Sequence, residues 1–192
     1  MVSDALTLGF DTSAAHCAAA LLSGEDVLIA RSEDITRGQA ERLMPLMEEM
    51  LASQALGWSD LTRIGVGVGP GNFSGIRISV SAARGLALSL GIPAIGVTTF
   101  EATALTAPEG QVPAVPAPQD QVYIARPGQD PRLIAKPEAG PITLPPEGAQ
   151  LATNIARIAH RATAPFTRPA PLYVRPADAA PPREAPPLIL DD

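Results

Sequence analysis

Two short stretches of the 192-residue sequence hold the groups best suited to chemistry. The first is Asp11-Thr12-Ser13, where a carboxylate and two hydroxyls follow an apolar run. These groups could hold a metal-bound phosphate, but the same residues also suit an Asx-type turn between two strands. Both interpretations stay open, because short motifs have many chance matches.

The second stretch, residues 67–75, has the sequence Gly-Val-Gly-Pro-Gly-Asn-Phe-Ser-Gly and joins a predicted strand to a predicted helix. Backbone N–H groups around Gly69, Gly71, Ser74 and Gly75 could cradle an anion at the helix N-terminus. The alternative is a tight turn with Ser74 as the N-cap. The stretch is neither a Walker A loop nor a dinucleotide fingerprint with a downstream acid.

The sequence contains no other recognisable catalytic pattern. His16 and His160 stand in no ligand motif, and Cys17 is the single cysteine, so no zinc site or internal disulfide is expected. A Gly-x-Ser-x-Gly elbow, a Cys/His nucleophile pair and a His-Glu-x-x-His motif are all missing. These observations give no support to a hydrolase.

Apolar spacing predicts alternating elements in the first half of the chain. A helix is indicated by a stripe at helical spacing, made of Leu43, Leu46, Met47, Met50 and Leu51. Pro45 should lie in the first turn of this helix or kink it. The predicted order is βββαβαβα, over residues 6–10, 17–22, 27–31, 43–51, 64–68, 74–90, 94–97 and 100–105.

Proline marks a change in composition near Ala107. All but Pro45, Pro70 and Pro93 of the 21 prolines lie beyond it. We therefore expect a domain over residues 1–106, a reduced proline-rich second domain over 107–178 and a proline-rich tail over 179–192. Prolines should limit residues 112–142 to edge strands or extended loop, with one helix at 155–162.

The predicted helix 74–90 has more apolar surface than a core alone requires. Apart from Arg77 and Arg84, its side chains are apolar, small or hydroxylic. Its small-residue face is opposite a face of larger apolar side chains, so a second chain could cover one of them. The alternative is that the predicted helix containing Met47 covers the extra apolar surface without a second chain. The small face comprises Ser81, Ala82, Gly85 and Ser89.

Charge and hydropathy limit the classes of function. The net charge of −6 argues against a protein that grips nucleic acid by itself, because phosphates require a basic surface. The N-terminus lacks a basic signal region, and no apolar run is long enough to span a bilayer. A soluble, unprocessed, cytoplasmic protein is expected.

Several stretches match the motifs of one known family, bacterial TsaB, also called YeaZ. The resemblance covers residues 5–106, and the stretch Gly-Pro-Gly-Asn-Phe-Ser-Gly-Ile-Arg is its most specific part. A weaker match to a C-terminal signature follows at residues 172–176. The matching stretches in the first half are residues 10–13, 41–46, 68–77 and 91–99.

The resemblance implies an α/β protein with the actin/sugar-kinase/Hsp70 fold, whose N-terminal domain is ribonuclease H-like. TsaB proteins are paralogues of TsaD, the subunit that forms threonylcarbamoyladenosine in tRNA. By this resemblance the chain is a non-catalytic dimerisation subunit that binds and activates TsaD, with the ATPase TsaE as a third member. Helices 39–53 and 74–90 would carry the interface, through Met44, Met47, Ile78, Ser81, Ala82, Gly85 and Ser89. Because its net charge is negative, we expect it to meet tRNA only through the complex. Because an exposed apolar face seeks cover, it could form a homodimer through the same surface when alone.

Two departures from TsaD indicate lost chemistry. Thr99 and Thr103 replace both histidines of TsaD's metal-binding Asn-His-x-Glu-x-His stretch, and a lone hydroxyl does not substitute for imidazole, so no metal is expected. A second glycine-rich loop is also missing beyond Ala107, so independent ATP hydrolysis is not expected. We expect no cofactor beyond a vestigial, weak or shared ATP/ADP site at Asp11, Thr12, Ser13, Gly69, Gly71, Ser74 and Gly75.

The chain also departs from TsaB itself. The charged residues of the strand Asp-Ala-Arg-x-x-Glu-Val-Tyr are absent at residues 116–123, and Gln39 stands where a histidine is common. Two other functions are alternatives for this sequence. A small ATP-dependent kinase of the same superfold would use Asp11 and the Gly69 loop, and a glycoprotease, the older label for this superfamily, would need a nucleophile or metal ligands that the sequence lacks.

Overall fold

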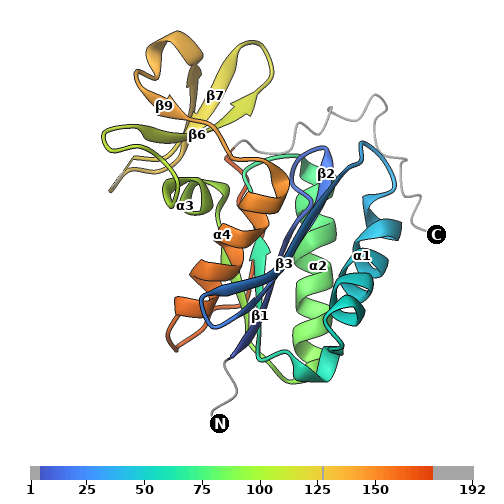
Figure 1. Ribbon diagram of the computed structural model, residues 1–192. Coiled ribbons are helices and arrows are strands. Elements are labelled where there is room, and N and C mark those ends of the chain that lie inside the picture. The colour runs from blue at the N-terminus through green and yellow to red at the C-terminus, as the bar shows by residue number, and fades with distance from the viewer. Residues whose placement is uncertain (1–4, 127, 175–192) are drawn as a thin grey trace, which may run out of the picture.

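A five-stranded sheet forms the larger part of the protein in the computed structural model, which describes residues 5–126 and 128–174 (Figure 1). The strand order is β3-β2-β1-β4-β5. The first three strands form an antiparallel meander, and β4 and β5 continue the sheet parallel to β1. The strands are β1 (Leu6–Asp11), β2 (His16–Ser23), β3 (Asp26–Asp34), β4 (Arg63–Gly67) and β5 (Ala94–Val97).

Helices cover both faces of this sheet. Side chains at odd positions of β2, such as Ala19 and Leu21, pack with α1 (Gln39–Ser53) and α2 (Phe73–Leu90). Even positions, such as Ala20 and Leu22, pack with α4 (Gly148–Arg161) on the opposite face. Since successive side chains of a strand point to opposite faces, a strand covered on both sides is expected to be continuously apolar, as β2 is from Cys17 to Leu22.

The predicted order βββαβαβα is confirmed, with small changes at the element ends. A short 3₁₀ turn, η1 (Trp58–Asp60), precedes β4, and α3 (Thr99–Ala104) follows β5. The prediction that Ser74 caps α2 is wrong. The cap is Asn72, whose side-chain oxygen accepts a hydrogen bond of 2.9 Å from the backbone N–H of Gly75.

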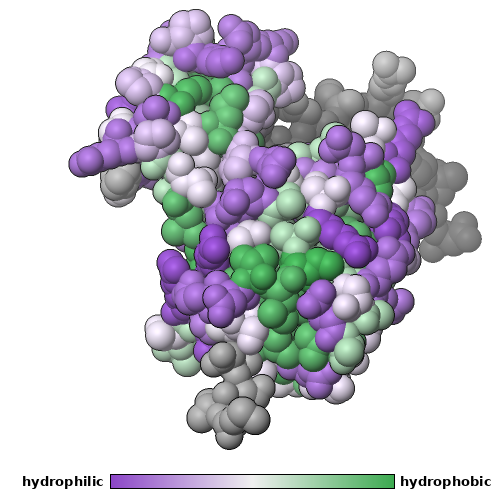
Figure 2. Space-filling view, in the orientation of Figure 1, coloured by the Kyte–Doolittle hydropathy of each residue, from purple (hydrophilic) through white to green (hydrophobic). Residues whose placement is uncertain are grey.

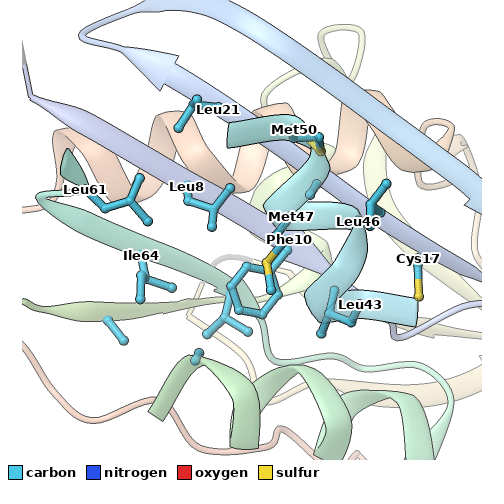
Figure 3. Packing of buried hydrophobic residues seen from close by; sticks show 14 of the residues in the cluster. Leu8, Phe10, Cys17, Leu21, Leu43, Leu46, Met47, Met50, Leu61 and Ile64 are labelled. Carbon is cyan, nitrogen blue, oxygen red and sulfur yellow. The ribbon is translucent and has the colours of Figure 1, made fainter. Parts of the chain in front are cut away.

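The predicted apolar stripe of α1 is buried against the sheet (Figure 3). Its side chains lie with Leu8, Phe10 and Ile64 in the main core. Pro45 is in the second turn, so the alternative that placed it in the first turn is wrong. Its ring lies on the exposed side of the helix, which continues to Ser53.

The edge strand β3 carries apolar side chains that the molecule leaves uncovered. Figure 2 shows apolar residues gathered below the middle of one face, over β3 and its surroundings. Val27 and Leu28 are 41% and 38% exposed. Strand β3 therefore exposes more apolar surface than is usual for an edge strand that faces water.

A second, four-stranded sheet has the order β8-β7-β6-β9. The prediction that residues 112–142 form only edge strands or loop is wrong, because β6 and β7 are internal. Strand β6 pairs with β9 at Val112 and Pro113 but with β7 from Ala114 onward, so each of its prolines has a strand on one side only. The elements are β6 (Val112–Ala117), β7 (Gln121–Ile124), β8 (Arg132–Ala135), η2 (Lys136–Glu138) and β9 (Ile142–Thr143).

The helix expected at residues 155–162 is longer than predicted. As α4, it begins at Gly148 and packs against β1, β2 and β4 of the first sheet. Residues beyond the predicted boundary at 106/107 therefore form the second sheet and also cover one face of the first sheet. The boundary itself stays a prediction. The predicted tail, 179–192, lies outside the described residues. Within the described ranges, no helix has the length and apolar character to cross a bilayer.

The close approach of α4 to the sheet predicts the effect of a single methyl group. A β-carbon at Gly9 would lie 2.6 Å from the Ala156 nitrogen and 2.7 Å from the Ala152 oxygen. Because both atoms are backbone, Gly9→Ala should lower the free energy of unfolding by about 1–3 kcal/mol, measured in urea. Gly85→Ala is the control. A β-carbon there meets nothing within 4 Å, so it should stabilise by up to about 1 kcal/mol. Equal urea midpoints for Gly9→Ala and the wild type would contradict this packing.

The thiol of Cys17 should be inert in the folded protein. Cys17 is fully buried, and burial first, then the charge of Glu33, raises its pKa from 9.0 to about 11. With a disulfide reagent at pH 8, labelling should be at least about tenfold slower in the native protein than in denaturant. Since the folded pKa is the higher one, the thiol's contribution to stability is complete below pH 9 and is lost as the pH rises towards 11. Equal native and denatured labelling rates would show that Cys17 is accessible.

Candidate functional site

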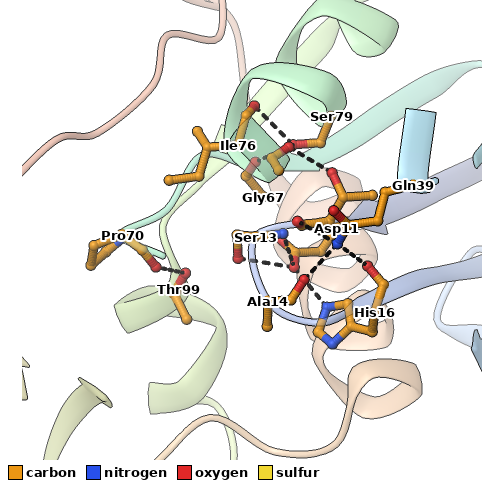
Figure 4. A network of polar contacts seen from close by, with 12 residues as sticks. Asp11, Ser13, Ala14, His16, Gln39, Gly67, Pro70, Ile76, Ser79 and Thr99 are labelled. Carbon is orange, nitrogen blue, oxygen red and sulfur yellow. Dashed lines mark hydrogen bonds and ion pairs between the residues drawn. The ribbon is translucent and has the colours of Figure 1, made fainter. Parts of the chain in front are cut away.

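The candidate site centres on Asp11, the last residue of β1, beside the N-termini of α1 and α2 (Figure 4). One carboxylate oxygen, Oδ2, accepts three hydrogen bonds. They come from the Ser13 backbone N–H at 2.9 Å, the Ser13 hydroxyl at 3.0 Å and His16 Nε2 at 2.8 Å. The backbone bond is that of an Asx turn, so this carboxylate organises the connection from β1 to β2.

The second oxygen of Asp11, Oδ1, is buried and has no hydrogen-bond partner among the described residues. It lies against Gly67 at the end of β4, where an added β-carbon would collide with it. Position 67 therefore has no room for a side chain. An unpaired buried acceptor is costly, and the three bonds to Oδ2 offset part of that cost.

Gln39 anchors the start of α1 to the same turn. Its side chain is buried, and its amide nitrogen lies within hydrogen-bond distance of the carbonyl oxygens of Ala14 at 2.6 Å, His16 at 3.0 Å and Thr12 at 3.3 Å. In the sequence, Gln39 is distinctive only because a histidine is common at this position in TsaB proteins. Its position four residues before Leu43 on the buried stripe was the available signal that it points inward.

The loop from β4 to α2 is tied to the turn as well. The Thr12 hydroxyl donates to the Gly75 carbonyl at 2.6 Å, and the Asn72 N–H donates to the Ser13 carbonyl at 2.6 Å. A β-carbon at Gly71 or Gly75 would collide with the backbone of this turn. The N–H groups of Asn72 and Gly75 are thus already bonded, and the glycines permit close packing, which favours the turn interpretation over an anion cradle.

A cleft of about 1170 Å³ lies between this turn and the second sheet. It brings together Ser13 and Gly71 of the predicted nucleotide residues, whereas Asp11, Thr12, Gly69, Ser74 and Gly75 do not line it. Asp34 and Glu147 are the acidic residues of its lining, and no lysine or arginine within residues 5–126 and 128–174 lines it. This charge distribution disfavours an unassisted phosphate group.

The threonines that stand in place of TsaD's histidines have structural partners. The Thr99 hydroxyl donates to the Pro70 carbonyl at 3.0 Å, and the Thr103 hydroxyl donates to the Thr99 carbonyl at 2.6 Å. No cluster of three histidine, cysteine, aspartate or glutamate side chains suited to a metal occurs in the described ranges.

The predicted partner residues are mostly at the surface, along a groove of about 410 Å³ between α1 and α2. Gly85 and Ser89 lie exposed further along α2. The placement of Met47 at the interface is corrected, because its side chain is fully buried in the core with Leu43 and Met50. The groove is lined by Ala40, Leu43, Met44, Arg77, Ile78, Ser81 and Ala82.

Comparison with known proteins identifies the family. The sequence model of the family TsaD, described as tRNA N6-adenosine threonylcarbamoyltransferase, matches residues 32–172. The chain therefore belongs to this family.

Within this family, the chain is similar to TsaB. It is 36% identical over 101 residues to the tRNA threonylcarbamoyladenosine biosynthesis protein TsaB of Haemophilus influenzae, which is 52% of this chain and 42% of the relative. The TsaB of Escherichia coli is 34% identical over 92 residues, 48% and 39% of the two chains. The chain thus spans about half the length of the curated relatives it matches, or less. These similarities confirm the resemblance predicted from the motifs.

Two solved structures from Pseudomonas aeruginosa share the fold. One is YeaZ, with a TM-score of 0.60 and 27% identity over 76% of this chain and 73% of that one. The other is an uncharacterized protein with similarity to peptidase YEAZ, with a TM-score of 0.73 and 22% identity, covering 89% of this chain and all of the other.

The bonds of Gln39 predict the effect of removing its amide. Gln39→Leu keeps most of the volume but leaves buried carbonyl oxygens without a donor, so the free energy of unfolding should fall by about 1–3 kcal/mol. Urea denaturation followed by circular dichroism measures it. Gln54→Leu, at the other end of α1, is the control, because the Gln54 side chain only contacts the neighbouring Ser53 hydroxyl in an exposed setting. A Gln39→Leu protein as stable as this control would show that the amide does not hold the turn.

Proposed function

We propose that this chain is a non-catalytic subunit that binds and activates TsaD in the formation of threonylcarbamoyladenosine in tRNA. The observation that carries the proposal is the apolar groove between α1 and α2, together with the similarity to TsaB. The two helices are those expected to carry the partner interface. The proposal places the chain in a complex with TsaD, with TsaE as a further member.

The surface of the groove suits another helix. Met44 and Ile78 present partly buried apolar side chains, while Ala82 and Gly85 leave room for close approach. A partner that covers this surface would remove apolar area from water, which drives association.

A non-catalytic role is supported because polar groups of the candidate site already form hydrogen bonds within the protein. Asp11 Oδ2 is occupied by Ser13 and His16, and Thr99 and Thr103 bond to backbone oxygens. The described part of the chain places no lysine or arginine in the cleft lining to pair with a phosphate. The proposal therefore includes no cofactor of the chain's own and gives no role to a kinase or a glycoprotease.

The finer fold assignment belongs to the same proposal. An antiparallel meander followed by two parallel strands is the arrangement expected of a ribonuclease H-like domain, as in the actin/sugar-kinase/Hsp70 superfold. The second sheet would then correspond to the reduced second domain. With a net charge of −6, the chain would meet tRNA only through its partner, in the cytoplasm, and would form a homodimer through the same groove when alone.

The test is co-purification with TsaD of the same organism, followed by a threonylcarbamoyl-transfer assay with and without this chain. A stoichiometric complex and modification that depends on the chain are the expected results. An isolated chain that hydrolyses ATP or phosphorylates a small molecule, without binding TsaD, would overturn the proposal.

A charge in the groove should abolish partner binding. Ala82→Glu would bury an unpaired carboxylate, so affinity for TsaD should fall at least about a hundredfold, measured by calorimetry. Gly85→Glu is the second variant, because its position is open in the free chain and folding should be unaffected. Ala104→Glu, exposed on α3, is the matched control and should bind normally. Normal binding by folded Ala82→Glu and Gly85→Glu proteins would exclude this surface.

A further inference from the structure

A second groove, of about 360 Å³, lies along the other side of α2 from the groove with α1. Residues 166–169 form its outer wall. Its two large exposed apolar side chains are Leu88, at 83%, and Phe166, at 39%. The lining comprises Arg84, Ala87, Leu88, Pro93, Ala94, Phe166, Thr167, Arg168 and Pro169.

The charges of this groove are all positive. Among the residues that the structure describes, Arg84 and Arg168 are the only charged ones in its lining. Arg84 is held in place by a 2.7 Å hydrogen bond from its Nε to the Pro169 carbonyl, while Arg168 is exposed. In a chain with a net charge of −6, an apolar surface bordered by two arginines favours a segment that combines aliphatic side chains with carboxylates.

One segment of the chain itself has this chemistry. Residues 188–192 read Leu-Ile-Leu-Asp-Asp. They lie outside the described residues, so only their sequence enters the argument. Leu188, Ile189 and Leu190 are the only large aliphatic residues from position 175 onward, and two aspartates follow them directly.

The described chain lies beside the start of α2 at its last residues, well before position 188. The Leu172 N–H donates to the Val68 carbonyl at 2.8 Å, and Arg77 Nε donates to the Tyr173 hydroxyl at 3.0 Å. From Arg77 to Leu88 the helix rises about 16 Å, at 1.5 Å per residue. The 14 residues from 174 to 188 can span up to about 46 Å, so the segment can reach the groove of its own chain.

We propose that the groove between α2 and residues 166–169 binds residues 188–192 of the same chain. The aliphatic side chains pack on Leu88 and Phe166, and Asp191 and Asp192 lie at Arg84 and Arg168. This contact covers the most exposed apolar side chain of α2 and is separate from the groove proposed for TsaD.

Disulfide trapping in the full-length chain tests the contact. The Leu88→Cys/Ile189→Cys protein is treated with diamide at micromolar concentration, and intramolecular cross-linking is followed by mass spectrometry and non-reducing gels. Met44→Cys/Ile189→Cys, which probes the groove with α1, is the matched control. We expect the Leu88 pair to cross-link at least about tenfold faster than the Met44 pair.

Charge reversal separates specific binding from chance encounter. Added to the Leu88 pair, Arg168→Glu should remove most of the rate advantage, and Asp191→Arg with Asp192→Arg should restore it in part. Equal rates for the Leu88 and Met44 pairs would overturn the proposal. Cross-linking that is mainly intermolecular would also overturn it, because the occupant would then be a second copy.

Discussion

The Asp11 carboxylate holds the turn between β1 and β2, and both α1 and α2 are anchored to that turn. Gln39 attaches α1 through carbonyl oxygens of the turn, and Thr12 attaches α2 through the Gly75 carbonyl. Hydrogen bonds to an ionised group are stronger than neutral ones. The relative position of α1 and α2 therefore depends on a few buried polar groups as well as on the apolar core.

Close backbone packing makes this arrangement possible. Gly67, Gly71 and Gly75 each lie where a β-carbon would collide with Asp11, Ser13 or Thr12. A glycine-rich loop between a strand and a helix is commonly associated with phosphate binding. In this protein the same glycines bring the loop against the turn, and the N–H groups of Asn72 and Gly75 are bonded within the protein.

The surface of α2 is the other distinctive feature of the molecule. Its inner face closes the core through Ile76, Val80 and Ala83. Its outer side borders one apolar groove with α1 and another with residues 166–169. The two grooves differ in charge, since among the described residues Arg77 is the one charged residue lining the first groove, whereas two arginines line the second. This difference gives them different expected occupants.

The sequence by itself determined the order of the elements in the first half, the buried stripe of α1 and the motifs that identify the family, because periodicity and short motifs are local properties. Only the tertiary structure decided that the Gln39 amide bonds to carbonyl oxygens of the β1–β2 turn and that Met47 is buried. It also decided that α4 begins at Gly148 and packs against the first sheet. It also made β6 an internal strand despite Pro113 and Pro116, since β6 pairs with different neighbours along its length. These outcomes depend on contacts between residues far apart in the chain, which no local pattern records.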